Sequence, residues 1–300
     1  MQTSVLTVLV PLDGSSFAER AIEPALKLGA MLRVPVGSGQ YLGDEDRGDN
    51  ADDAYLRTIA NDRGLGWCQQ VEGADVATGL VALAQERNAL ICMSTHGHGR
   101  AEAIMGSRAE RVVALCPEAV VLVGRSYEFD SPLRIKSIVV PLDGTTQAET
   151  VCVHAIAWAL RLGVPVRFVT MAEEVEPPLR ADHPAPHRFG PVGDPNAYID
   201  GIVEKYRQPG LTLSGEVYRD QLSPASGFAQ LLRDGLDSLV ILAADFRTGT
   251  QRLLHGSTAG DIIDVSPVMV MVFATTHVAT AVATHAVAVA VAVQGQVATA

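Results

Sequence analysis

The feature that most constrains the fold of this chain is an internal repeat. The run Val-Pro-Leu-Asp-Gly occurs at residues 10–14 and again at 140–144, and Val-Pro-Val occurs at 34–36 and 164–166, so both pairs lie 130 residues apart. The pair Gly106-Ser107 returns as Gly256-Ser257, at an offset of 150. The longer offset falls mostly in residues 172–196, which hold six prolines and predict an irregular loop. Several agreeing registers indicate a duplication, with one structural unit in each half.

Within each half, short apolar runs alternate with helical patterns. The runs Leu6–Val10, Val34–Val36, Leu65–Val71, Ala89–Met93 and Ala119–Val123 predict strands, and Ala77–Glu86 and Arg108–Leu115 predict helices. Ser16 and Glu19 form a capping box for another helix, which Pro24 should bend. Alternating β and α segments favour a parallel sheet with helices on both faces. We therefore predict two open, mostly parallel five-stranded α/β domains, residues 1–130 and 131–274, and an Ala/Val/Thr-rich tail, residues 275–300.

Charge and cysteine usage exclude several classes of function. The net charge is −11 and only three lysines occur, so a basic face for nucleic acid or a polybasic membrane patch is not expected. Cys68, Cys92, Cys116 and Cys152 lack metal-site or CxxC spacing and predict free thiols in a reducing compartment, with Cys92 in the core. The first residues predict a strand rather than a signal peptide, and we expect a cytoplasmic protein.

The segment from Ile91 to Ser107 has the features of an anion cradle. A predicted strand enters a loop of small residues, and Gly106-Ser107 then opens a helix. Backbone N–H groups of such a loop and the helix N-terminus can converge on a phosphate. Asp13 leaves the first strand at the carboxyl edge, where open α/β sheets bind ligands, and it suits a ribose or adenine donor. The alternative is that Asp13 only caps the turn at Ser15–Ser16.

These residues resemble a tandem universal stress protein over roughly residues 4–274. That family carries Pro-x-Asp after its first strand and Gly-x2-Gly-x9-Gly-Ser/Thr after its fourth, and its nucleotide-binding members hold ATP there. The first half offers Pro11-Leu-Asp13 and Ser94-x2-Gly97-x8-Gly106-Ser107, so Ser94 replaces the first glycine and the loop is one residue short. The resemblance implies an adenine nucleotide alpha hydrolase-like fold with ATP as the ligand.

The resemblance also implies a role for each matching residue. Asp13 would bind the nucleoside, Met93 would border the base or ribose, and Gly39 falls at the adenine-contacting position of the second strand. The phosphate positions are Ser94, Gly97, Gly106 and Ser107, to which the residue chemistry adds His98 and Arg108 as donors. The expected binding set is Pro11, Asp13, Gly39, Met93, Ser94, Gly97, His98, Gly106, Ser107 and Arg108, with no catalytic or metal-binding residue.

The second half keeps Pro141-Leu-Asp143 and Gly256-Ser257, but Arg247 stands where the second glycine of the motif belongs. A guanidinium there would fill the space needed by a phosphate, so we expect one nucleotide per chain, bound in the first half. In the family that this chain resembles, the apolar fifth strands pair across a dimer, so the resemblance implies that the two fifth strands of this chain pair with each other, and a homodimer is an alternative.

Three classes of function stay open from the sequence. The first is a nucleotide-dependent stress-response regulator without enzymatic turnover. The second is a slow ATPase or nucleotidyl transferase that uses Asp13 and a magnesium ion. The third is an interaction or scaffold module that no longer binds a nucleotide. For residues 275–300, an added strand or hairpin and a disordered tail are both compatible with the sequence.

Overall fold

The computed structural model describes residues 5–42, 53–72, 75–95, 107–130, 134–173, 193–220, 224–244 and 258–275. The strands of the first half are β1 (Thr7–Pro11), β2 (Val36–Leu42), β3 (Trp67–Glu72), β4 (Ala89–Ser94) and β5 (Val120–Val123). Those of the second half are β6 (Ser137–Leu142), β7 (Val166–Glu173), β8 (Leu213–Asp220), β9 (Ser238–Ala244) and β10 (Val270–Ala274). The helices are α1 (Ser16–Glu19), α2 (Ile22–Leu32), α3 (Asp53–Arg63), α4 (Val76–Glu86), α5 (Ser107–Leu115), α6 (Thr146–Glu149), α7 (Cys152–Leu162), α8 (Pro195–Tyr206), α9 (Pro224–Arg233) and α10 (Thr258–Val265).

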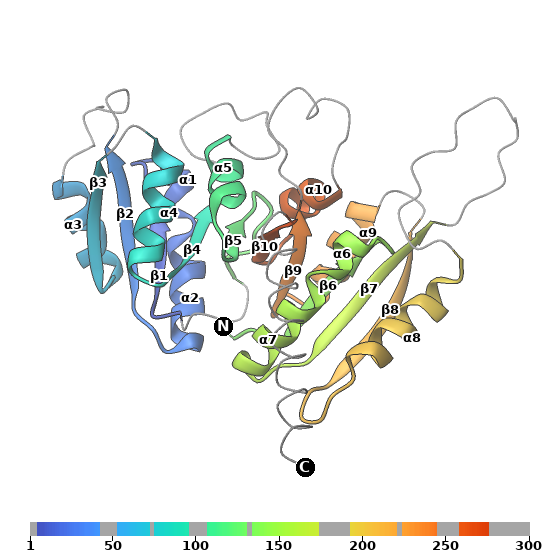
Figure 1. Cartoon of the computed structure of the whole chain (residues 1–300). Helices are drawn as coiled ribbons and strands as arrows, with labels where there is room; N and C mark the ends of the chain where they lie inside the picture. Colours follow the sequence, from blue (N-terminus) through green and yellow to red (C-terminus); the bar gives the residue numbers. More distant parts are fainter. Residues whose placement is uncertain are drawn as a thin grey trace, which may run out of the picture.

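The described strands form one sheet of ten, in the order β3-β2-β1-β4-β5-β10-β9-β6-β7-β8 (Figure 1). Within each half all neighbouring strands are parallel. The halves meet at β5 and β10, which pair antiparallel with Val121 opposite Met271. The predicted α/β class and the pairing of the fifth strands within the chain are both confirmed.

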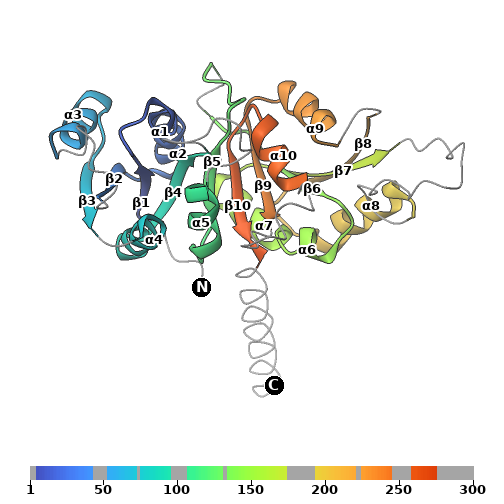
Figure 2. The ribbon, with the colours of Figure 1, turned by 90° about the horizontal axis from the view of Figure 1, so that it is seen from above.

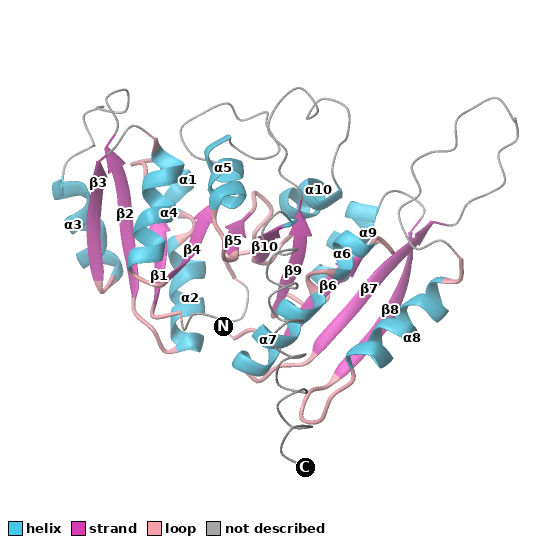
Figure 3. Ribbon diagram, in the orientation of Figure 1, coloured by secondary structure: helices cyan, strands magenta, loops and turns pink. Residues whose placement is uncertain are grey.

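Helices cover both faces of this sheet (Figures 2 and 3). The alternation of a strand divides the core into two layers: Val8 and Val10 of β1 pack in one cluster, with α2 and α3, and Leu9 packs in the other, with α4 and α5. Each central strand is therefore buried on both faces, as its continuous apolar run predicts. Cys92 is fully buried in the first cluster, as expected, and burial raises the pKa of its thiol to about 12.

The structure corrects the predicted first helix. The N-cap is Ser15 rather than Ser16, and the helix is interrupted after Glu19, so that α1 and α2 are separate. Pro24 lies in the first turn of α2 and does not bend it, since the same interruption separates α6 from α7, where His154 takes the equivalent position. The break therefore belongs to the repeated backbone and does not depend on proline.

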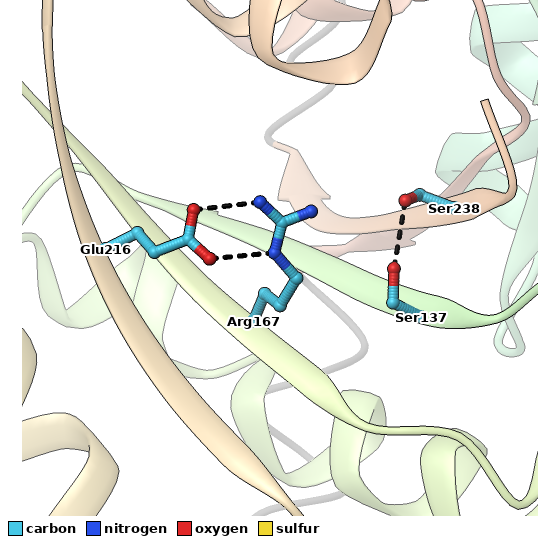
Figure 4. Close-up of polar contacts among 4 residues, drawn as sticks. All are labelled: Ser137, Arg167, Glu216 and Ser238. Carbon is cyan, nitrogen blue, oxygen red and sulfur yellow. Dashed lines mark hydrogen bonds and ion pairs between the residues drawn. The ribbon is translucent and has the colours of Figure 1, made fainter. Parts of the chain in front are cut away.

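The two halves fill one equivalent position in different ways. In the first half the indole of Trp67 lies over Gly37, where an added Cβ would stand 2.0 Å from the ring, and the Arg87 guanidinium lies 4.3 Å from the ring centroid. In the second half the residue equivalent to Gly37 is Arg167, whose guanidinium makes two 2.8 Å hydrogen bonds to the Glu216 carboxylate on the next strand (Figure 4). The same backbone thus accommodates an aromatic ring in one half and an ion pair in the other.

Two helices, the C-terminal tail and the possibility of a membrane span complete the comparison with the sequence-based expectations. The helices α3 and α8 were not predicted from the sequence. Residues 276–300 lie outside the described residues, so both interpretations of the tail stay open. No helix in the described part of the chain is long and apolar enough to cross a membrane.

Candidate functional site

The chain order places a topological switch point between β1 and β4. From β1 the chain proceeds to β2 and β3 on one side, and then to β4 and β5 on the other. Strands β1 and β4 pair in parallel, with Leu9 opposite Ile91, so their carboxyl ends lie at the same edge. The crevice outside the carboxyl ends at such a point is where open α/β sheets bind ligands. Asp13, which follows β1, and the end of β4 therefore lie at the same edge of the sheet.

Asp13 follows β1 at this edge, and its carboxylate organises the next turn. The Oδ1 atom accepts hydrogen bonds from the Ser15 backbone N–H at 3.0 Å and from the Ser15 hydroxyl at 2.5 Å. Ser15 Oγ in turn accepts from the N–H of Ala18 at 3.1 Å and caps α1. Gly14 has a φ of 80°, a left-handed value that suits glycine. The capping role given above as an alternative for Asp13 is therefore present in the structure.

A tyrosine that was not among the predicted site residues, Tyr55, lies near this aspartate. The Tyr55 hydroxyl of α3 donates a 2.9 Å hydrogen bond to the Glu19 carboxylate at the end of α1. Burial, the Glu19 carboxylate and the negative charge of Asp13 raise the pKa of Tyr55, so the phenol stays protonated and acts as a donor. Asp13, Glu19 and Tyr55 thus form one electrostatic group at the edge. The contact between Tyr55 and Glu19 was not predicted, because Glu19 was assigned to a capping box and α3 was not expected.

The carboxyl end of β4 is tied to β5. Ser94 is 9% exposed, and Thr95, which follows it, donates its backbone N–H to the Val123 carbonyl at 3.1 Å. Met93 is 8% exposed and packs in the core beside α4 and α5, so its backbone is the part nearest the edge. Helix α5 begins at Ser107, as predicted, and Arg108 on its first turn is exposed. Arg111 of α5 forms a 3.0 Å ion pair with Asp75, the N-cap of α4.

Pro11 and Gly39 lie opposite each other in the pairing of β1 with β2, and the Leu12 N–H donates to the Gly39 carbonyl at 2.8 Å. A Cβ on Gly39 would stand 3.0 Å from both Leu9 Cδ1 and Leu83 Cδ2. The Cα–H of Gly39 on this side therefore faces the core under α4, where a side chain would not fit. The carbonyl of Gly39 accepts a hydrogen bond from Leu12, the residue before Asp13.

The same turn exists in the second half. Asp143 Oδ1 accepts from the Thr145 N–H at 2.9 Å and from its hydroxyl at 2.6 Å, and Thr145 caps α6. Glu149 occupies the position of Glu19, but here it forms a 3.3 Å ion pair with Lys205 of α8. Tyr198 of α8 lies near Glu149 and Asp143 as Tyr55 lies near Glu19 and Asp13, and in each half burial and these carboxylates raise the pKa of the phenol. The second edge therefore adds a lysine to a tyrosine–carboxylate group that both halves share.

Several predicted site residues lie outside the described residues. They are Gly97, His98 and Gly106 in the first half and Arg247, Gly256 and Ser257 in the second, and the side chain of Ser107 belongs with them. Over the ranges that are described, no group of three or more His, Cys, Asp or Glu side chains could hold a metal ion.

The strand order defines a class of protein: a duplicated α/β fold with a topological switch point in each half, between β1 and β4 and between β6 and β9. The sequence model of the universal stress protein family matches residues 5–124 and 134–274. The chain belongs to the universal stress protein family, with two copies of its domain in tandem.

Solved structures agree on the fold. A universal stress protein from Archaeoglobus fulgidus DSM 4304 superposes with a TM-score of 0.64 at 15% identity, covering 92% of this chain and 100% of that one. A putative universal stress protein from Pseudomonas aeruginosa UCBPP-PA14 gives a TM-score of 0.54 at 15% identity, covering 93% and 97%. At such identities the similarity concerns the fold alone. A search of curated protein sequences found no significant match.

Proposed function

We propose that this chain binds one adenine nucleotide, ATP, at the carboxyl edge of its first half and acts as a nucleotide-dependent regulator in a stress response. The observation that carries the proposal is the switch point between β1 and β4: Asp13 follows β1, Ser94 ends β4, and α5, which begins at Ser107, is the next helix along the chain. These positions match the nucleotide-binding motif of the family, to which the chain belongs.

The chemistry of the described residues fits such a ligand. Asp13 offers a carboxylate to ribose or adenine donors, and its Oδ1 is oriented by Ser15. The phosphates belong at the other side of the crevice, away from Asp13 and Glu19, because like charges repel. The N-terminus of α5 supplies N–H donors and a positive dipole end there, and Arg108 on its first turn adds a positive charge.

The second half is proposed not to bind a nucleotide. Its glycine motif is broken at Arg247, and the Glu149–Lys205 ion pair lies on the helices next to Asp143. Both halves nevertheless use their aspartate in the same capping turn. That shared structural role makes Asp143 the matched control for Asp13.

The test is to denature purified protein and identify the released nucleotide by chromatography, in the wild type and in Asp13→Asn and Asp143→Asn. We expect about one ATP per chain in the wild type and in Asp143→Asn, and a loss of at least about tenfold in affinity in Asp13→Asn, the order expected when a charge-assisted hydrogen bond is removed. Two nucleotides per chain would overturn the assignment of the second half. Release of ADP that accumulates with added ATP would favour the slow ATPase, and no binding on titration would leave the interaction module.

A further inference from the structure

A cavity of about 300 Å³ lies at the seam between the two halves. It is found where β4 and β5 begin and, because β10 runs antiparallel to β5, where β10 ends. This is the edge of the first-half sheet opposite to the proposed nucleotide site. Both halves line it: the turns before β4 and β5 come from the first half, and α7 and β10 from the second. Its volume is at the lower end of ligand pockets, roughly 300–1,000 Å³.

The walls of this seam cavity are mostly apolar and partly aromatic. Trp158 and Phe273 line it and are 5% and 6% exposed. Burial raises the pKa of the Cys116 thiol to about 11, so this wall is neutral at physiological pH. The exposed Arg161 brings a positive charge: its guanidinium lies 5.3 Å from the Trp158 ring centroid and donates to the Val5 carbonyl at 3.2 Å. The exposed Glu118 is the acidic lining residue.

The duplication supplies a second seam for comparison. The positions equivalent to Trp158 and Arg161 on α7 are Leu28 and Met31 on α2, and Pro117 before β5 corresponds to Pro267 before β10. That second seam is covered by the chain that follows β5. The Glu128 N–H donates to the Pro267 carbonyl at 2.9 Å, and the Ile135 N–H approaches Met31 Sδ at 3.2 Å.

Aromatic rings fill the second seam, and cations flank them. Tyr127 is 5% exposed and meets Phe129 edge to face, with ring centroids 5.0 Å apart. The Arg20 guanidinium lies 5.0 Å from the Phe129 ring, and Lys27 Nζ lies 5.9 Å from the Tyr127 ring. Both cations also bind carbonyl oxygens of the same segment: Arg20 binds Arg125 at 3.0 Å and Lys27 binds Phe129 at 3.2 Å. The second seam thus shows what fits this geometry: planar aromatic rings with hydrogen-bond acceptor oxygens facing a cation.

We propose that the seam cavity is a second ligand site, for a small planar aromatic molecule that carries a carboxylate or a comparable anionic group. The rings of Trp158 and Phe273 contact the planar part of the ligand, and the guanidinium of Arg161 binds its anionic group. Because both halves supply walls, the ligand would bridge them and stabilise the β5–β10 junction. The inference does not depend on nucleotide binding, since the two sites lie at opposite edges of the first-half sheet.

The test uses a matched pair of fluorescent probes on the full chain: 1-anilinonaphthalene-8-sulfonate, and N-phenyl-1-naphthylamine, which has the same rings without the sulfonate. We expect about one sulfonate probe per chain, displaced by 1-naphthoate. Arg161→Gln should weaken the sulfonate probe about tenfold, as loss of a hydrogen bond to a charged group predicts, and change the uncharged probe little. Glu118→Gln should strengthen the sulfonate probe, because it removes the opposing charge.

Two further variants distinguish binding in the cavity from non-specific adsorption of the probes to apolar surface. Ala89→Phe places a ring in the cavity lining and should abolish binding of both probes, whereas Ala82→Phe, on the exposed face of α4 outside the cavity, should not. Arg233→Gln on α9 is the charge control for Arg161→Gln. Thermal unfolding of each variant checks that it folds. Absence of binding by the wild type, or binding unchanged in both Arg161→Gln and Ala89→Phe, would overturn the proposal.

Discussion

The two halves of this chain share a backbone plan and differ in what they place inside it. Ser38 on β2 and Phe168 on β7 occupy equivalent positions and are both fully buried. At the neighbouring position, Gly37 has no side chain and the indole of Trp67 lies over it, whereas the equivalent Arg167 pairs with Glu216. By contrast, the aspartate turn after the first strand is the same in both halves to within 0.1 Å in its hydrogen bonds, 3.0 and 2.5 Å against 2.9 and 2.6 Å.

The shared turn shows that a residue can persist after duplication for a structural reason alone. Asp13 and Asp143 each orient a residue that caps a helix, and this role alone would retain them. The halves differ instead in what surrounds the following glutamate: a tyrosine lies beside it in both, and in the second half Lys205 also pairs with Glu149. The added lysine offsets the negative charge of the second edge, whereas in the first edge Glu19 is bound by a neutral phenol.

The largest expected effect contrasts the buried residues Phe168 and Ser38. Phe168→Ala should lower the free energy of unfolding by about 4 kcal/mol, because it removes a fully buried ring and leaves a cavity. Ser38→Ala should cost close to nothing, since Ser38 Oγ is buried and has no hydrogen-bond partner among the described residues. Urea denaturation followed by circular dichroism measures both. Equal losses of stability in the two variants would show that the Ser38 hydroxyl makes a stabilising hydrogen bond and would contradict the prediction.

The next effect concerns Gly37. Gly37→Val should destabilise the first half by roughly 3 kcal/mol, because its Cβ would stand 2.0 Å from the Trp67 ring and the indole must leave its place. Gly201→Ala in α8, where nothing lies within 4 Å, should instead stabilise by about 0.5–1 kcal/mol through helix propensity. Thermal unfolding compares the two. A tolerated Gly37→Val would mean that Trp67 moves without cost.

Much of this architecture was predictable because the repeat and the apolar runs carry it. The central strands follow from continuous apolar segments of the expected length, and α4 and α5 from helical patterns. The pairing of β5 with β10 was expected from the resemblance to the family. Helix α3 was missed because only part of its surface is apolar: Leu56 is fully buried, but the helix follows an acidic stretch. Its Tyr55 contact to Glu19 joins residues 36 apart in sequence, and no local pattern encodes such a distance.

The site was predictable to the extent that strand ends define it. Asp13, Ser94 and Ser107 were proposed as site residues because Asp13 follows the first strand, Ser94 ends β4 and Ser107 begins α5. The filling of Gly37 by Trp67 and of its counterpart by an Arg167–Glu216 pair depends on side-chain packing across neighbouring strands. The register of those strands is a tertiary property, and a single sequence does not specify it.

A smaller effect separates the two helix caps. Ser15→Ala should cost about 1.5 kcal/mol, near the upper part of the range for an N-cap, because Ser15 is buried and also binds Asp13. Thr145→Ala should cost about 0.7 kcal/mol, because Thr145 is exposed and water can replace its hydroxyl. Chemical denaturation gives both values. A larger cost at Thr145 would contradict the argument from burial.

The smallest effect distinguishes the ion pair of the second half from the aromatic packing of the first. The Arg167 hydrogen bonds lower the pKa of Glu216 below its ordinary 4.5, so the pair's contribution is present above that value and is lost as the pH falls through the folded-state pKa. Because both side chains are partly exposed, this contribution is about 0.5 kcal/mol at low salt. The stability difference between wild type and Glu216→Gln should therefore shrink between pH 7 and pH 3. The cost of Trp67→Phe, which removes a 2.9 Å hydrogen bond to Thr7 and no titrating group, should stay constant over the same range. A pH-dependent cost at Trp67, or a constant one at Glu216, would show that the two halves do not differ in the way their side chains indicate.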